Sequence, residues 1–94
     1  MKNSCFEKAN LTKCDFRHVN ARDCNFGKSI LVGSDMKEGD FENCNFNEAE
    51  LQDSNLDGAN LTNVTINGAN IANASFNNVR GLQMPVNGAD PANR

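Results

Sequence analysis

Large apolar residues recur at every fifth position along most of this chain. The stretch 41–61 shows the pattern most clearly, with polar or small residues separating Phe41, Phe46, Leu51, Leu56 and Leu61. An amphipathic helix would repeat apolar positions every three or four residues, and a half-buried strand every two. Because a period of five matches neither, the pattern indicates a repeat fold in which each five-residue unit adds one side chain to a shared core.

The apolar register runs from Phe6 to Phe76, and only Ala21 breaks it. The residue two places before each register position is small or β-branched. In an extended segment these two residues point to the same face, and the residue between them points away. The predicted core residues are Phe6, Leu11, Phe16, Phe26, Leu31, Met36, Phe41, Phe46, Leu51, Leu56, Leu61, Ile66, Ile71 and Phe76.

When register positions twenty residues apart are grouped together, similar side chains fall on the same face. This predicts four five-residue units in each turn of a coil. Phe6, Phe26 and Phe46 fall on one face in this arrangement. Parallel crossovers are almost always right-handed. The expected fold is therefore all-β, a right-handed quadrilateral parallel β-helix of about four coils. On the irregular face, Val19 is expected to fill the space that Ala21 leaves, and Gly39 to make room for Phe41. The β-helix is expected over residues 1–78, with a C-terminal cap and flexible tail over 79–94.

The repeat resembles the pentapeptide-repeat family, whose consensus is Ala-Asp/Asn-Leu-x-x. The best matches are Ala9–Leu11, Ala59–Leu61 and Ala69–Ile71, and the near variants are Cys14–Phe16, Cys24–Phe26 and Cys44–Phe46. The resemblance covers residues 4–78 and implies the same right-handed quadrilateral β-helix. It also implies a possible function, because some members of the family mimic duplex DNA, bind type II topoisomerases and protect them from quinolones.

The four cysteines allow three interpretations: two disulfides, a metal site, or small core residues. No pair has the C-x-x-C spacing, and Cys14, Cys24 and Cys44 occupy the small position of the repeat. Small buried residues are therefore favoured over redox or metal chemistry. The chain has neither an apolar run long enough to span a membrane nor a signal-peptide pattern at its start. The expected compartment is the cytoplasm, with no membrane contact.

Acidic residues concentrate in the middle of the chain. Residues 1–34 carry six basic and three acidic groups, whereas residues 35–57 carry eight acidic groups and one basic group. Wound into coils, the acidic residues form a belt, made of Asp35, Glu38, Asp40, Glu42, Glu48, Glu50, Asp53 and Asp57. The belt either maintains solubility or contacts a basic protein partner, and it argues against nucleic acid as a direct ligand. Ile30 and Val32 are expected to point outward as a small additional contact patch.

No catalytic pattern accompanies the repeat. The only histidine, His18, is expected at a solvated corner with no partner to orient it, and no Gly-rich phosphate loop is present. Residues 53–58 imitate the start of a calcium loop, but Val64 stands where that loop requires a glutamate. We therefore expect no cofactor, no metal and no enzymatic activity.

Two functions follow from these observations. The first is a non-enzymatic structural or protein-interaction module with an unidentified partner. The alternative, which rests on the resemblance, is a DNA-mimicking protein that binds DNA gyrase. The unpaired edge expected at residues 4–7 also suggests a homodimer formed through one end of the coil.

Overall fold

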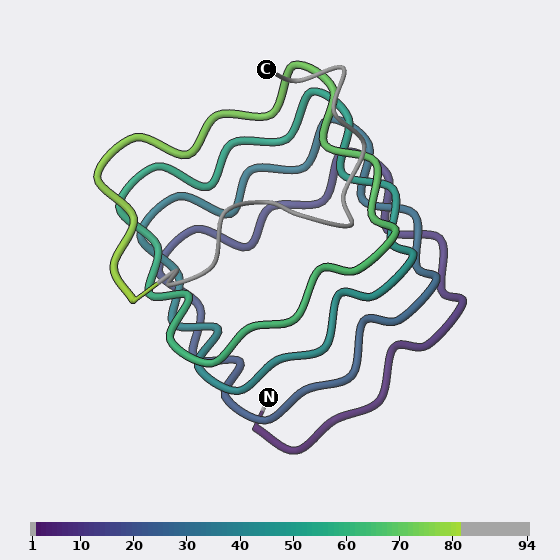
Figure 1. The fold of residues 1–94 in the computed structure, drawn as a ribbon, viewed down its shortest axis with the longest axis horizontal. Coiled ribbons are helices and arrows are strands. Elements are labelled where there is room, and N and C mark those ends of the chain that lie inside the picture. The colour runs from purple at the N-terminus through teal and green to yellow at the C-terminus, as the bar shows by residue number, and fades with distance from the viewer. Residues whose placement is uncertain (1, 82–94) are drawn as a thin grey trace.

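The chain winds into stacked four-sided coils with twenty residues in each turn (Figure 1). The computed structural model describes residues 2–81. Isolated parallel bridges join residues twenty positions apart, from Cys5 and Asn25 at one end to Asn60 and Arg80 at the other. This spacing confirms four five-residue units per turn. Backbone pairing continues to Arg80, and the cap and tail expected at the C-terminus lie mostly outside the described residues.

Residues 2–81 contain neither a helix nor a continuous strand, and so no helix that could cross a membrane. Each unit contributes one bridged residue. The Phe6 N–H donates to the Asn25 carbonyl at 2.7 Å, and the Asn25 N–H donates to the Ser4 carbonyl at 3.0 Å. The sequence predicted parallel strands, but pairing is limited to single bridges because the chain turns a corner immediately after each core residue.

Each corner is a type II turn. The N–H of Ala9, for example, donates to the carbonyl of Phe6 at 3.0 Å, three residues earlier. The second corner residue has a positive φ, between 57° and 73°, at every corner from Asn3 to Asn78. Type II turns require a positive φ at this position, which Gly and Asn adopt most easily. Here Lys, Glu and His adopt it as well, at Lys8, Lys13, His18, Lys28, Glu38 and Glu48.

The core fills the inside of the coil, and its residues define four faces. We name the faces by their core residues: the first by Phe6, Phe26, Phe46 and Ile66; the second by Leu11, Leu31, Leu51 and Ile71; the third by Phe16, Met36, Leu56 and Phe76; the fourth by Ala21, Phe41 and Leu61. Core residues of the middle coils are buried, whereas Phe6, Leu11, Phe16 and Phe76 in the end coils are only partly buried.

Aromatic contacts organise the first and fourth faces. The Phe26 ring stacks between Phe6 and Phe46, with centroid distances of 5.2 and 4.9 Å. Phe41 meets the edges of Phe26 and Phe46 at 6.2 and 5.8 Å, so its ring reaches from the fourth face into the middle of the coil. Val19 packs against the core next to Ala21, as expected.

Candidate functional site

The outward residue between the two inward positions has a structural role wherever it is Asn or Asp. From Asn10 to Asn70, each Asn or Asp at this position accepts a hydrogen bond from the backbone N–H two residues later. For example, Asn45 Oδ1 accepts from the Asn47 N–H at 2.7 Å. These Asx turns stabilise the corners. Asp35 and Asp40, predicted as contact residues, therefore serve the fold as well.

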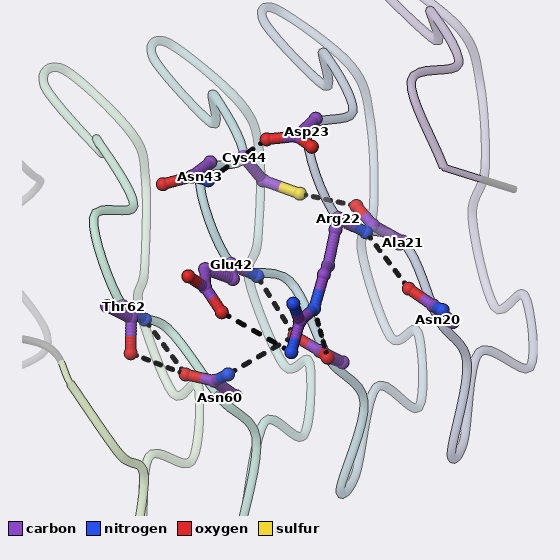
Figure 2. Close-up of polar contacts among 10 residues, drawn as sticks. Asn20, Ala21, Arg22, Asp23, Glu42, Asn43, Cys44, Asn60 and Thr62 are labelled. Atoms are coloured by element: carbon purple, nitrogen blue, oxygen red, sulfur yellow. Dashed lines mark hydrogen bonds and ion pairs between the residues drawn. The ribbon is translucent and has the colours of Figure 1, made fainter.

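The acidic belt encircles the coil, and basic residues one coil earlier neutralise part of it. Arg22 Nε lies 2.7 Å from Asp40 Oδ2, and Arg22 Nη2 lies 3.5 Å from Glu42 Oε1. Asn60 donates to the same Asp40 carboxylate from the next coil at 3.2 Å, and Figure 2 shows this network across three coils. Partial burial opposes ionisation of Asp40, but the hydrogen bonds from Arg22 and the Glu42 N–H outweigh it and lower the pKa of the Asp40 carboxyl.

The third face has a similar arrangement around Arg17. This guanidinium pairs with Asp15 at 2.8 Å and lies 3.8 Å from Asp35 in the next coil. The hydrogen bonds from Arg17 lower the pKa of Asp15 to about 2. Asp57, also at this face, accepts hydrogen bonds from Ser75 and from the Asn77 N–H, which lower its pKa.

His18 has a partner, which corrects the expectation that nothing orients it. His18 Nδ1 lies 3.3 Å from Glu38 Oε1, directly one coil along. Both side chains are more than half exposed, at 71% and 57%. The pair lies at an open corner, and the described residues bring no other His, Cys, Asp or Glu to it as a metal-binding group.

The second face is different. The carboxylates of Glu48, Glu50 and Asp53 form no ion pair or hydrogen bond within residues 2–81. In the preceding coil of the same face, Ile30 and Val32 occupy outward positions, but neighbouring coils leave them half-buried instead of fully exposed. Ile30 bridges to Asn10 on one side and to Glu50 on the other. Unpaired carboxylates and aliphatic side chains therefore gather on one side of the coil.

The cysteines are free thiols and take the predicted places. Cys24 and Cys44 are buried, Cys14 is partly buried and Cys5 is exposed. The Cys44 thiol donates to the Ala21 carbonyl at 2.8 Å. Burial raises the pKa of Cys44 to about 12, so the thiolate that redox or metal chemistry requires does not form at neutral pH.

Comparison with known proteins identifies the family to which the repeat belongs. A family model described as a pentapeptide repeat region matches residues 1–84. The chain belongs to the pentapeptide-repeat family. No curated protein matches it.

Solved pentapeptide-repeat structures share the fold. A protein from the thylakoid lumen of Arabidopsis thaliana is 26% identical, with a TM-score of 0.81, and the match covers 95% of this chain and 62% of that one. Rfr23 from Cyanothece 51142 is 17% identical, with a TM-score of 0.84 and coverages of 98% and 57%. HetL from Nostoc sp. strain PCC 7120, involved in heterocyst differentiation regulation, is 17% identical, with a TM-score of 0.57 and coverages of 92% and 48%. The chain thus spans less than two thirds of these relatives.

The pentapeptide-repeat pattern explains which outward residues can be assigned to function. In that pattern an Asn or Asp at the outward position stabilises the corner. The second face departs from the pattern, because it has Ile30 and Glu50 at this position. Neither side chain can form the Asx turn, and the carboxylate of Glu50 has no partner among residues 2–81. The sequence could have shown this departure. Ile30 and Glu50 stand twenty residues apart at outward positions where the repeat usually has Asn or Asp, so they fall on the same face.

Proposed function

We propose that this pentapeptide-repeat chain is a non-enzymatic protein-interaction module in the cytoplasm, wound right-handed, that binds its partner through the second face. The observation that carries the proposal is that Glu48, Glu50 and Asp53 lie in one coil of this face, next to Ile30 and Val32 in the coil before it. The other carboxylates of the belt are used inside the molecule. Asp35, Glu38, Asp40 and Glu42 pair with Arg17, His18 or Arg22, and Asp57 accepts hydrogen bonds from Ser75 and Asn77.

The chemistry of the second face suits a protein surface that presents Lys or Arg beside an aliphatic side chain. Ile30 and Val32 supply apolar contact, and the three carboxylates of the next coil supply charge complementarity. The negative charge disfavours the phosphate backbone of nucleic acid as a ligand. The four free cysteines support the cytoplasmic location, because disulfides are rare in that compartment.

The test compares two variants with equal charge changes. The second-face variant combines Glu48→Gln, Glu50→Gln and Asp53→Asn, and the control combines Glu38→Gln, Glu42→Gln and Asp57→Asn on the other side. A partner captured from a lysate of the source cells by the unaltered protein is purified, and its affinity for all three proteins is measured by calorimetry. We expect at least tenfold weaker binding by the second-face variant alone. Equal affinities, or a loss confined to the control, would refute the assignment.

Binding of DNA gyrase as a DNA mimic is the second candidate, and the excess of acidic residues over 35–57 favours it. Against it, Arg17 and Arg22 neutralise the belt on the third and fourth faces, which interrupts the even negative charge of a duplex. A supercoiling assay with and without a quinolone distinguishes the two candidates. If the protein inhibited gyrase or rescued it from the drug, and the second-face variant did so equally well, gyrase binding would replace the first proposal.

A further inference from the structure

The second face carries lysines as well as carboxylates. In the two coils before its three carboxylates, the corners of this face carry Lys8, Lys13 and Lys28. All six residues are exposed, and their charged groups form no ion pair or hydrogen bond within residues 2–81. The face therefore presents Lys beside aliphatic side chains, which is the chemistry that its own carboxylates and apolar residues suit in a partner.

The opposite charges lie at equal distances on either side of the coil that carries the apolar residues. Lys8 and Glu48 stand forty residues apart at one corner of the face. Lys13 and Asp53 stand forty residues apart at the other corner. Since one turn is twenty residues, each pair is separated by two coils, and the coil between them is the one that contains Ile30. The face therefore has a positive side and a negative side around an apolar middle.

We propose that the second face binds the second face of another copy of this chain, with the two coils antiparallel. This inference rests on the proposed function, because it names the partner of the same face. A two-fold axis through the middle coil brings the apolar residues of both copies together. It also places Lys8 of each copy opposite Glu48 of the other, and Lys13 opposite Asp53. Such an interface is self-complementary and closes as a dimer.

Charge selects the antiparallel arrangement. If the coils were parallel, lysines would face lysines and carboxylates would face carboxylates, which is unfavourable. In the antiparallel dimer, Glu50 faces Asn10, whose side-chain N–H can donate to a carboxylate. Lys28 lies at the axis opposite the same residue of the second copy, but a Glu48 from each copy lies one coil away. At the other corner, Gly33 places no side chain at the axis.

The test exchanges the charges of the two sides. The first variant combines Lys8→Glu with Lys13→Asp, and the second combines Glu48→Lys with Asp53→Lys. Lys, Glu and Asp all adopt the positive φ of these corners elsewhere in the chain, so the backbone accommodates the changes. Sedimentation of the full, reduced chain is measured from micromolar to millimolar concentration. We expect the unaltered chain to dimerise and each variant alone to associate at least tenfold more weakly. An equimolar mixture should recover the association, because opposite charges face each other again.

A control separates this recovery from general attraction between oppositely charged proteins. The control combines Glu38→Lys with Glu42→Lys, which makes the same charge change as the second variant but away from the second face. A fluorescent label on the first variant follows its association with either protein. We expect recovery with the second variant and not with the control. An unaltered chain that remains monomeric, a mixture that does not recover, or equal recovery with the control would overturn the antiparallel dimer.

The apolar middle is tested by Ile30→Asn. Asn is the usual outward residue of the repeat and can form the Asx turn that Ile30 cannot, so the fold is expected to be retained. Association should weaken severalfold, whereas the urea midpoint, measured at a concentration where the chain is monomeric, should not fall. Unchanged association would contradict the position of Ile30 at the two-fold axis.

The outcomes distinguish this inference from the proposed function. If the unaltered chain remains monomeric while the partner captured from the lysate still requires the three carboxylates, only the dimer is overturned. If substitutions on the second face change neither self-association nor binding of the captured partner, both the dimer and the assignment of the second face are overturned.

Discussion

The ring of Phe41 occupies the space that a side chain at Gly39 would fill. A Cβ atom built on Gly39 would lie 2.9 Å from Phe41 Cζ and closer still to Cε2. Gly39 stands at the small inward position, where other coils carry Ala49, Ala59 or Ala69. It does not have a positive φ, so the glycine is required by the ring and not by the backbone.

Gly39→Ala should therefore destabilise the protein by about 1–3 kcal/mol, the usual cost of overpacking a core. Urea unfolding measures the change. Gly27→Ala is the control, because a Cβ there meets the side-chain amides of Asn25 and Asn45 at 3.1 and 3.4 Å, which is a much looser contact than the one with Phe41. Phe41→Leu should recover part of the loss in the Gly39→Ala background. Equal destabilisation by both glycine substitutions would show that Phe41 is not the cause.

Phe46→Ala should cost about 3–5 kcal/mol, because it removes a buried ring that contacts both Phe26 and Phe41. Phe6→Ala should cost clearly less, since the Phe6 ring is only partly buried and stacks on one side. His18→Ala, at an exposed corner, should change stability by no more than about 0.5 kcal/mol. Denaturant midpoints of the three variants give this order, and a reversed order for the two phenylalanines would contradict the burial gradient along the coil.

Much of the fold could be predicted because the sequence repeats its core pattern in one unbroken register. The period of five placed each core residue, and the recurrence of Phe6, Phe26 and Phe46 indicated twenty residues per turn, as the bridges confirm. The extent of backbone pairing could not be read in the same way. Two inward residues suggest a strand, but the type II turn that follows each core residue leaves room for a single bridge.

The candidate site was harder to predict, because its electrostatics depend on neighbouring coils. The segment charges showed an acidic belt but did not show that Arg22 reaches both Asp40 and Glu42. The signal was present as opposite charges eighteen and twenty residues apart. This spacing indicates an ion pair only when the length of one turn and the direction of the corner side chains are known.

Replacing Arg17 with Gln should raise the pKa of Asp15 from about 2 toward the ordinary value of 3.8. The side-chain hydrogen bonds from Arg17 are the largest cause of the lowered pKa and are lost with the charge, whereas the backbone N–H of residue 17 still donates to Asp15. Because the folded-state pKa is below the unfolded one, this carboxylate stabilises the fold above about pH 4, and the contribution is lost as pH falls toward about 2. Carboxyl titration by NMR measures the pKa directly. An unchanged Asp15 midpoint in Arg17→Gln would mean that Arg17 does not pair with it in solution.

Lys28→Asn should stabilise the protein by about 0.5–1 kcal/mol, because Lys28 adopts a φ of 57° that costs most L residues energy and that Asn tolerates. Asn already occupies the same corner position at Asn43, Asn63, Asn73 and Asn78. The control is Lys37→Asn, which makes the same change of charge and side chain. Lys37 is the first of the two residues of its corner, where φ is not positive. Urea unfolding of both variants separates the backbone effect from the loss of a positive charge. A gain limited to Lys28→Asn would confirm that strained corners limit the stability of this coil, whereas equal changes would assign the effect to charge.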